Sequence, residues 1–295
     1  MKIVVTGSLG HVGQPLAQAL VRQGHAVTVI SSKPGKQAAI EALGATAAIG
    51  SVEDAGFLAA AFADADAVFA MVPPNFGAPD PRAYYQQLGR RYAQAIQAAG
   101  VKRVVHLSSW GAHLSQGTGF ILGSHDIEGL LNALPDVSVT HLRPGYFYYN
   151  LNNYIGLLKS QGIIGSNYGG EDKLVLVHPT DIATAAAEEL ATPTAGSGVR
   201  YVASDERTPN EVARVLGAAL GKPDLRWVTF TNEQVQQSLE TRGVPAHIAA
   251  LSVALGSSIH RGALGEDYEQ HKPATLGQVK LEDFAQEFAA AYQAS

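Results

Sequence analysis

The sequence predicts an α/β fold in which a doubly wound parallel sheet is accompanied by a smaller, mainly helical C-terminal lobe. Up to about residue 145, short β-branched runs alternate with amphipathic helical windows, a pattern typical of parallel strands joined by crossover helices. A loop with glycines at intervals of three follows the first of these runs. After Pro144 the alternation gives way to an aromatic and Asn-rich stretch, and much of the remaining chain has a helical pattern.

Six strands are expected before the alternation ends. They cover residues 2–6, 26–31, 45–49, 66–72, 102–108 and 138–142. Right-handed crossovers between them give an open sheet with helices on both faces. A later run, "GVRYVAS", is expected to return to this sheet. We therefore expect a sheet domain of residues 1–150 plus about 178–205, and a smaller lobe of residues 151–177 and 206–295.

Composition excludes several classes of function. The chain has 295 residues and is 46% hydrophobic, which suffices for a substantial core. A net charge of −5 without a basic cluster argues against direct nucleic-acid binding. Because there are no cysteines, disulfides, thiolate zinc sites and a cysteine nucleophile are excluded. No signal peptide or apolar stretch of about 20 residues is present, so we expect a cytoplasmic protein with no membrane partner.

The glycine loop "TGSLGHVG" lies between the first strand and a helical pattern. Gly7 permits a sharp turn, Gly10 allows a bound group to approach the backbone, and Gly13 allows the helix to pack on the strand. The N–H groups at the start of the following helix then attract a pyrophosphate. The alternative is a strand-to-helix connection whose glycines serve turn geometry alone. The loop lies near the N-terminus, ahead of several β/α units, and this position favours nucleotide binding over the alternative.

The end of the second strand bears on the choice of cofactor. An acid there binds the ribose 2′-hydroxyl of NAD, whereas a cation accommodates the 2′-phosphate of NADP. The segment "VISSKPGK" has no acid and offers Ser31, Ser32, Lys33 and Lys36. We therefore expect NADP(H) in preference to NAD(H). The alternative is an ordinary solvated loop.

Four segments together carry a family resemblance: "TGSLGHVG", "HLSSWGA", "LRPGYFYYN" and "HPTDIATAA". With them the chain resembles the NmrA-like branch of the atypical short-chain dehydrogenases over most of its length, more weakly beyond about residue 230. The resemblance implies a Rossmann domain with a small C-terminal lobe and a usual preference for NADP(H). It implies either reduction of quinones or related carbonyl substrates, or sensing of the NADP redox state by a regulatory protein.

The resemblance also implies positions for the cofactor. The pyrophosphate loop corresponds to Gly7, Ser8, Leu9, Gly10, His11, Val12 and Gly13. The remaining cofactor contacts implied are Gly50, Val72, Pro73, Pro74, Ser108, Ser109, Pro144, Gly145 and Tyr146. After the second strand the family commonly has Arg, where this chain has Ser32 followed by Lys33. After the third strand it often has Gly-Asp, where this chain has Gly50 followed by Ser51.

The usual acid–base pair of short-chain dehydrogenases is absent. These enzymes place a Tyr and a Lys four residues apart on the helix after the fifth strand, where Lys lowers the pKa of Tyr. The corresponding segment, "GFILGSHDIEGLLNAL", contains neither residue. His125 and Ser109 are the remaining catalytic candidates, since an imidazole can exchange a proton near neutral pH. The alternative for His125 is a solvated ring or a hydrogen bond to Glu128.

Aromatic residues gather where the fifth and sixth strands end, the edge at which doubly wound sheets bind ligands. The candidates for contact with the substrate are Trp110, Tyr146, Tyr148, Tyr149 and Asn150. Flat rings there can stack on a quinone-like acceptor, although packing in the core is the alternative for at least half of them. Asp181 is expected to cap a helix rather than to act in catalysis.

These observations predict an oxidoreductase that transfers hydride from NADP(H) to a quinone or a similar small carbonyl acceptor. A non-catalytic NADP-redox sensor with a regulatory protein partner is the alternative. No metal is expected, because the ten histidines show no metal-binding spacing. The protein is expected to be a monomer or a homodimer.

Overall fold

The computed structural model describes residues 1–75, 77–192 and 196–295. Its main sheet contains β1 (Lys2–Val5), β2 (Ala26–Ser31), β3 (Thr46–Ile49), β4 (Ala67–Ala70), β5 (Arg103–Leu107), β6 (Ser138–Pro144) and β10 (Gly198–Val202). The strand order is β10-β6-β5-β4-β1-β2-β3, with parallel pairing from β6 through to β3. Since β1 lies in the interior of the sheet, the loop that follows it reaches the middle of the carboxyl edge.

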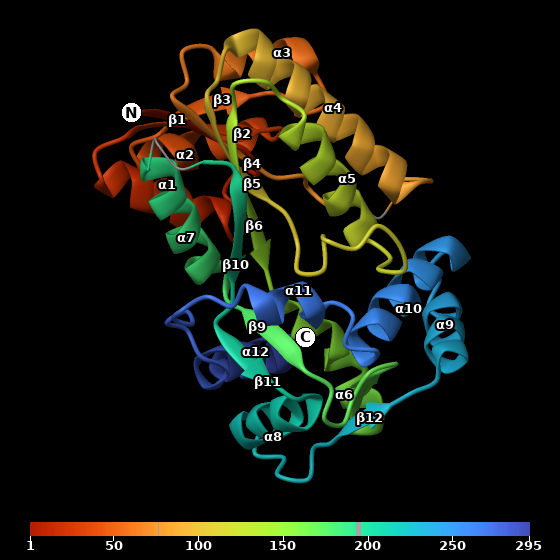
Figure 1. Ribbon diagram of the computed structural model, residues 1–295. Helices are drawn as coiled ribbons and strands as arrows, with labels where there is room; N and C mark the ends of the chain where they lie inside the picture. The colour runs from red at the N-terminus through yellow and green to blue at the C-terminus, as the bar shows by residue number, and fades with distance from the viewer. Residues whose placement is uncertain (76, 193–195) are drawn as a thin grey trace. The chain divides into compact units, whose positions relative to one another are not determined.

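Helices cover both faces of this sheet. They are α1 (Gly13–Arg22), α2 (Gln37–Ala42), α3 (Ala55–Phe62), α4 (Pro81–Ala99), α5 (Ile121–Asn132) and α7 (Pro179–Ala191), with the 3-10 turn η1 at Pro34–Lys36. Figure 1 shows α1 and α7 on one face and α4 and α5 on the other. Apolar residues of β1, β4 and β5, including Val4, Val68 and Val104, are buried against α4 and its neighbours. This two-sided burial explains why the strands have near-continuous apolar sequences.

The chain divides into two compact units. The first comprises residues 1–109, 123–143 and 182–200, and the second comprises residues 110–122, 144–181 and 201–295. Compared with the division expected from the sequence, the second unit also includes residues 110–122, 144–150, 178–181 and 201–205. The loop after β5 is therefore built into the C-terminal unit rather than into the sheet domain.

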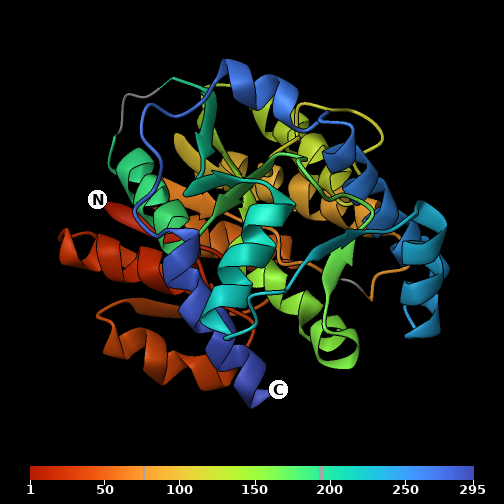
Figure 2. The same ribbon diagram turned by 90° about the horizontal axis from the view of Figure 1, so that it is seen from below.

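The second unit combines two small sheets with helices. Its strands are β7 (Tyr146–Phe147), β8 (Ile164–Ser166), β9 (Leu174–Val177), β11 (Asp205–Arg207) and β12 (Trp227–Thr229), in the orders β11-β9-β7 and β12-β8. Its helical segments are η2 (Tyr148–Tyr154), α6 (Ile155–Gln161), α8 (Pro209–Ala219), α9 (Asn232–Thr241), α10 (Ala246–His260), α11 (Gly265–Gln270) and α12 (Leu281–Ala294). Helices α8 and α12 pack side by side (Figure 2).

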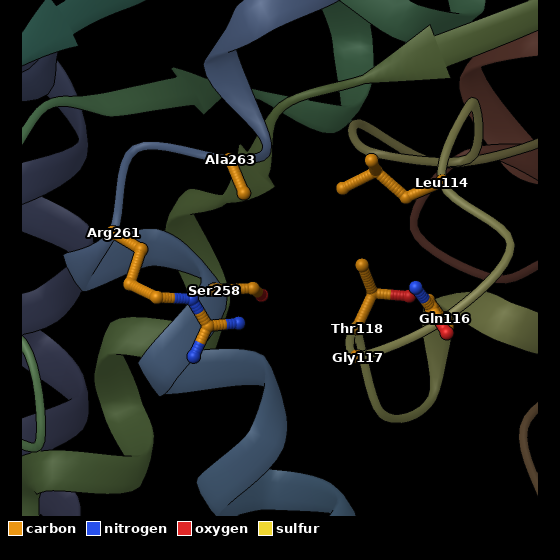
Figure 3. Close-up of a pocket in the computed structure, with 7 residues that line it drawn as sticks. All are labelled: Leu114, Gln116, Gly117, Thr118, Ser258, Arg261 and Ala263. Carbon is orange, nitrogen blue, oxygen red and sulfur yellow. The ribbon is translucent and has the colours of Figure 1, made fainter.

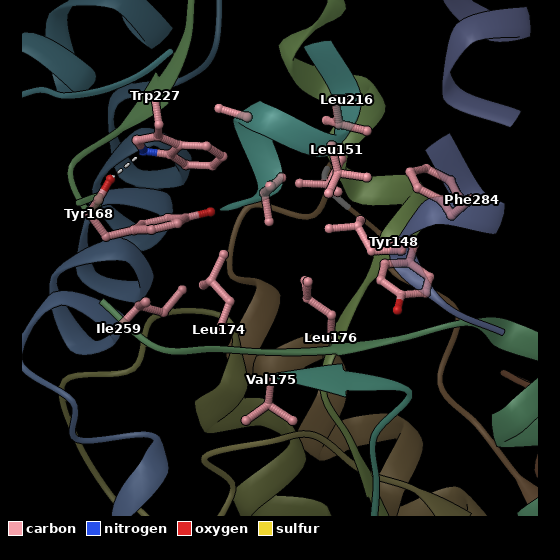
Figure 4. Close-up of a cluster of buried hydrophobic side chains, with 14 of the residues drawn as sticks. Tyr148, Leu151, Tyr168, Leu174, Val175, Leu176, Leu216, Trp227, Ile259 and Phe284 are labelled. Carbon is pink, nitrogen blue, oxygen red and sulfur yellow. Dashed lines mark hydrogen bonds between the residues drawn. The ribbon is translucent and has the colours of Figure 1, made fainter. Parts of the chain in front are cut away.

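An aromatic core holds the second unit together (Figure 4). Trp227 lies against Tyr168 with ring centroids 5.4 Å apart, and its Nε1 donates a hydrogen bond to the Tyr168 carbonyl at 2.6 Å. Tyr148 stacks on Phe284 at 5.3 Å. Such ring pairs stabilise a fold by more than the burial of their apolar area alone. Together with the buried residues around them they give the second unit a hydrophobic core of its own.

The sequence prediction of the fold is confirmed. All six early strands are present within two residues of their expected bounds, and "GVRYVAS" contributes β10 beside β6 in the main sheet. The predominance of helix after residue 205 is also as expected. Within the described ranges, every helix is too short or too polar to cross a membrane.

Candidate functional site

The glycine loop after β1 has the geometry that its sequence predicts. Gly7 has a φ of +94°, a left-handed conformation that side chains rarely adopt, and a Cβ there would overlap Sδ of Met71. A Cβ on Gly13 would overlap the carbonyl oxygen of Ser8. The third glycine therefore makes room for the backbone of the loop itself, whereas we expected it to make room for the strand. Ser8 also has a positive φ, of 57°.

Helix α1 begins at Gly13 without a side-chain cap, although the Gln14 N–H donates to the Gly10 carbonyl at 3.1 Å. Val12 occupies the N-cap position and forms no side-chain hydrogen bond, and the first turn carries no acidic residue. The partial positive charge of the helix N-terminus is thus left for another anion. Leu16 and Leu20 are fully buried, which fixes the helix on the sheet with this end at the loop. A loop that requires glycine at positions 7 and 13 and ends at a helix without a side-chain cap fits a dinucleotide pyrophosphate.

The end of β2 is tied to the same loop. Ser8 Oγ donates a hydrogen bond to Ser31 Oγ at 2.9 Å, and the Lys33 backbone N–H donates to Ser31 Oγ at 3.2 Å. Ser31 is 2% exposed, whereas Ser32, Lys33 and Lys36 are exposed. The two lysines are thus available to a charged ligand, and Ser31 fixes the position of the loop.

The segment after β4 is anchored from below by Thr6. Its hydroxyl accepts a hydrogen bond from the Met71 N–H at 2.8 Å, and Tyr92 Oη donates to the Met71 carbonyl at 2.7 Å. Sequence reasoning missed both anchors, because a Thr and a Tyr in apolar runs carry no visible signal of pairing. Of the three residues implied here by the resemblance, Val72 is buried, Pro73 is half-buried and Pro74 is exposed. After β3, a Cβ on Gly50 would lie 2.5 Å from the Phe57 ring, which accounts for glycine there by packing.

The end of β5 carries a buried charged group that the sequence reading did not identify as a site. Ser108 Oγ donates to Glu128 Oε1 at 2.5 Å, and Arg143 forms an ion pair with the same carboxylate at 2.6 Å. Glu128 was considered only as a partner for His125. Because Glu128 binds both Ser108 and Arg143, the Ser108 hydroxyl is held in place by a hydrogen bond within the protein.

Helix α5 confirms the absence of the dehydrogenase pair from this position, since its residues include no Tyr and no Lys. His125 lies on this helix, half-buried, beside Asp126, whose carboxylate receives two hydrogen bonds from Arg82. The positive charge available on His125 contributes to lowering the pKa of Asp126, after the larger effect of the Arg82 hydrogen bond. Ser109, at the end of the first unit, is half-buried.

In the second unit the backbone at the end of β6 is fixed by close contacts. The Trp110 N–H donates to the Pro144 carbonyl at 2.9 Å, and the Gly145 N–H donates to the Val202 carbonyl at 3.0 Å. A Cβ on Gly145 would collide with the carbonyl of Val175. The backbone of Pro144 and Gly145, implied as cofactor contacts by the resemblance, is therefore held in place by neighbouring strands.

The predicted aromatic contacts separate into two groups. Tyr148 is fully buried, donates a hydrogen bond to Asp205 Oδ2 at 3.1 Å, and belongs to the core of the second unit. The Tyr148 ring therefore packs in the core and is not exposed to stack on a substrate, contrary to the expectation from the sequence. Tyr146 and Tyr149 are half-buried, and burial raises the pKa of both phenols, for Tyr149 to about 12. Asn150 is half-buried in η2.

A cavity of about 360 Å³ lies in the second unit beside the loop that follows Trp110. Figure 3 shows Leu114 and Thr118 of this loop facing Ser258 and Arg261 across it. Thr118 is fully buried and its Oγ1 has no hydrogen-bond partner among the residues that the structure describes. Sequence reasoning did not identify these residues, because the two sides of the cavity are separated by more than 130 positions in the chain.

Comparison with known proteins agrees with this architecture. The model of the NmrA-like family matches residues 1–257. The chain belongs to the NmrA-like family. An NAD(P)H azoreductase of Xenophilus azovorans is 27% identical to this NmrA-like protein over 250 residues, covering 84% of this chain and 83% of the relative. The uncharacterized oxidoreductase YesF of Bacillus subtilis is 27% identical over 264 residues, covering 88% and 85%. The protein is thus a distant homologue of NAD(P)H-dependent oxidoreductases.

Solved structures share the fold of this NmrA-like protein at low identity. An NADPH-dependent quinone oxidoreductase from Escherichia coli, complexed with NADPH, superposes with a TM-score of 0.83 at 20% identity, covering 97% of this chain and 99% of the other. A Citrobacter sp. triphenylmethane reductase complexed with NADP(H) gives 0.79 at 19%, with the same coverage. NmrA, a negative transcriptional regulator in complex with NAD, gives 0.77 at 16%, covering 99% and 97%.

Proposed function

We propose that this protein is an NADP(H)-dependent oxidoreductase that reduces a quinone or a similar small conjugated carbonyl compound. One feature carries the proposal: the uncapped N-terminus of α1 closes a glycine loop, and the neighbouring strand β2 ends in exposed lysines without an acid. The uncapped end of α1 favours a pyrophosphate, and the exposed lysines after β2, with no acid beside them, favour a 2′-phosphate.

The chain's own residues have distinct parts in this proposal. Residues 7–13 hold the pyrophosphate through backbone N–H groups, while Lys33 and Lys36 attract the 2′-phosphate. The Ser31 hydroxyl fixes the loop through Ser8. Ser108, held by Glu128, shapes the end of β5 together with Ser109. Bound NADPH supplies a hydride from its nicotinamide ring.

Reduction of a quinone requires a proton in addition to the hydride. Because α5 has no Tyr–Lys pair, the protein offers His125 on the same helix as a proton donor. Hydride transfer to a quinone leaves a phenolate, a much weaker base than the alkoxide formed from a ketone, so water can supply the proton at a lower rate when no side chain does. This explains how a chain without the dehydrogenase pair can retain reductase activity.

A non-catalytic NADP-redox sensor is the second candidate function. It is favoured by the missing acid–base pair and by the commitment of the Ser108 hydroxyl to Glu128. A sensor needs the glycine loop and the lysines but no acceptor turnover. Its partner is then a regulatory protein that distinguishes the oxidised from the reduced cofactor.

Stopped-flow or steady-state absorbance at 340 nm separates the two functions. NADPH oxidation is measured with and without a panel of benzoquinones, naphthoquinones and azo dyes, alongside calorimetric binding of NADPH. An enzyme gives acceptor-dependent oxidation that saturates with one class of acceptor. Tight binding without acceptor-dependent oxidation supports the sensor, and absence of binding removes both functions.

A further inference from the structure

A second, larger cavity lies entirely within the second unit. It encloses about 450 Å³, within the range of about 300–1,000 Å³ typical of small-molecule sites. Its apolar walls come from Trp110, Leu174, Ile259 and Leu264, each at most 5% exposed. These residues belong to the loop after β5, to β9 and to the segment around the end of α10. No residue of the glycine loop or of the β2 end lines it.

The rim of this cavity is acidic. Five carboxylates line it: Asp172, Glu206, Glu211, Glu266 and Glu269. The permanently charged cations in the lining are Lys173 and Arg207. The Arg207 guanidinium also faces two carboxylates outside the lining, Asp205 at 3.3 Å and Glu282 at 3.1 Å. Its charge is thus shared among Asp205, Glu282 and the rim residue Glu211, and Lys173 pairs with Glu269 at 3.4 Å, so the five carboxylates are compensated only in part.

One edge of the cavity already holds an ammonium group. Lys272 Nζ lies 3.0 Å from Glu206 Oε2, 3.1 Å from Glu269 Oε2 and 5.5 Å from the centre of the Tyr268 ring. A cation between carboxylates and over an aromatic face is the arrangement used to recognise organic ammonium ions. Lys272 itself does not line the cavity, but its partners Glu206, Tyr268 and Glu269 do, so these lining residues already bind one cation of the protein.

The other rim carboxylates retain capacity for a second cation. Glu211 uses one oxygen, Oε2, to accept the Thr208 N–H at the start of α8, and its other oxygen has no role in that capping box. Glu266 lies exposed in the first turn of α11. Asp172 is paired with His260 at 2.8 Å. Glu211 and Glu266 are therefore the carboxylates best suited to a bound cation.

We propose that this cavity binds a small organic cation with an apolar or aromatic body, which lies against Trp110 and Leu264 and places its charged group beside Glu211 and Glu266. The apolar walls supply burial of the body, and the acidic rim selects against anions of the same shape. Trp110 is also a candidate for contact with the reductase substrate, but the cation is tested on the protein without cofactor, so failure of this proposal is distinguishable from failure of the reductase function.

Tryptophan fluorescence provides a direct readout. The chain has two tryptophans, Trp110 in the cavity wall and Trp227 in the aromatic core, so W227F leaves Trp110 as the reporter. The W227F protein is titrated with benzyltrimethylammonium, with neutral benzyl alcohol and with anionic 3-phenylpropionate. We expect a saturable change with the cation and affinities about tenfold weaker or worse for the other two. Calorimetry on the unmodified chain checks that W227F has not altered the site.

A double variant tests the charged rim. E211Q/E266Q keeps an acceptor oxygen for the Thr208 cap while removing two charges, and E233Q/E240Q on α9 removes two charges outside the cavity. We expect E211Q/E266Q to weaken binding of the cation about tenfold, and E233Q/E240Q to change it less than about twofold. Circular dichroism and melting temperature verify folding. A linear, non-saturable titration, equal affinity for the three probes, or equal effects of the two double variants would overturn the proposal.

Discussion

Arg143 and Glu128 form a buried bidentate ion pair under the end of the parallel sheet. Arg143 donates from Nε to Oε1 at 3.0 Å and from Nη2 to Oε2 at 2.6 Å, where both side chains are 8% exposed. Ser108 completes the carboxylate's partners at 2.5 Å. Burial is the largest single effect and raises the pKa of Glu128, but the hydrogen bonds and charge of Arg143, together with His141 and the Ser108 hydrogen bond, lower it below the usual value. The pair thus connects the ends of β5 and β6 to α5.

Removing one member of this pair is expected to destabilise the first unit. E128Q leaves the Arg143 guanidinium buried without a counter-charge, which costs about 3–5 kcal/mol. Urea unfolding followed by circular dichroism measures the loss. E188Q is the control, because Glu188 pairs with Arg200 at the surface, where side-chain exposures are 56% and 37%, and such a pair contributes about 0–1 kcal/mol. Equal losses in the two variants would show that the buried pair has no special role.

His106 and His141 are expected to make stability depend on pH. Their Nδ1 atoms are 3.0 Å apart, both rings are 1% exposed, and His141 Nε2 lies 2.9 Å from Asn132 Oδ1. Burial lowers the pKa of each ring. The charge of His141 lowers the pKa of His106 further, whereas for His141 the charge of Glu128 opposes the effect of burial and that of Arg143 adds to it, and the net pKa remains lowered. The unfolded chain therefore binds protons first as the pH falls below about 6.5, and the free energy of unfolding decreases with falling pH.

The slope of the free energy of unfolding against pH identifies the histidines responsible. Each histidine protonated only in the unfolded chain contributes about 1.4 kcal/mol per pH unit. H106F removes one such group and keeps an aromatic ring, so we expect it to reduce the slope between pH 6.5 and pH 5 by about that amount. H247Q replaces an exposed histidine on α10 and is expected to leave the slope unchanged. Urea midpoints across this pH range supply the comparison, and an unaltered slope in H106F would assign the dependence to other groups.

Local sequence patterns predicted the sheet and the glycine loop because their causes are local. An apolar run with helical windows on both sides specifies a buried strand, and Gly7 marks a backbone conformation that side chains avoid. Even here the partner of Gly13 could not be predicted, because the Ser8 carbonyl reaches it through the turn of the loop. A glycine in the sequence indicates that a side chain would not fit at that position, but it does not identify the atom with which the side chain would collide.

Side-chain pairing over long separations could not be predicted. Asp181 was expected to cap a helix, but this expectation was wrong. Its carboxylate accepts hydrogen bonds from Ser204 Oγ at 2.6 Å and from the Gln278 N–H at 3.0 Å, while lying inside the first turn of α7. The buried site of Glu128 and Arg143 was missed for the same reason. Charged residues in a helix and a strand look solvated until the fold places them face to face.

Lys33 is expected to determine the choice between the two pyridine nucleotides. K33E reverses the charge at the exposed end of β2, so it should weaken NADPH binding by about tenfold or more through repulsion of the 2′-phosphate, and NADH binding by less than about threefold. Calorimetry with both nucleotides measures the two affinities. K102E, an equal charge change at an exposed residue before β5, should affect neither. Equal weakening of NADPH and NADH by K33E would remove the 2′-phosphate assignment.

His125 is expected to contribute to turnover and not to cofactor affinity. If its imidazole delivers the proton, H125A lowers kcat/KM for a quinone by about 10²–10⁴-fold, and NADPH binding stays within about twofold. A solvent isotope effect and the pH profile of kcat/KM accompany the comparison, because a packing role would leave both unaltered. An H125A enzyme with unchanged kcat/KM for every reducible acceptor would remove this residue from the mechanism.

Gly10 offers a test of the cofactor loop that separates binding from folding. A Cβ there would lie 3.3 Å from the Gly7 carbonyl and would otherwise face solvent, so G10A is expected to cost about 1 kcal/mol of stability or less. The same methyl group stands where a pyrophosphate must approach the backbone, so NADPH affinity should fall about tenfold or more.

Two further glycine variants serve as controls. G7A imposes a side chain on a φ of +94°, so it should lower the free energy of unfolding by about 1–3 kcal/mol and also weaken NADPH binding. G156A on α6 has open space for its methyl group and should retain affinity without loss of stability. Full NADPH affinity in G10A would place the dinucleotide away from this loop, because a pyrophosphate at the expected position would collide with the added methyl group.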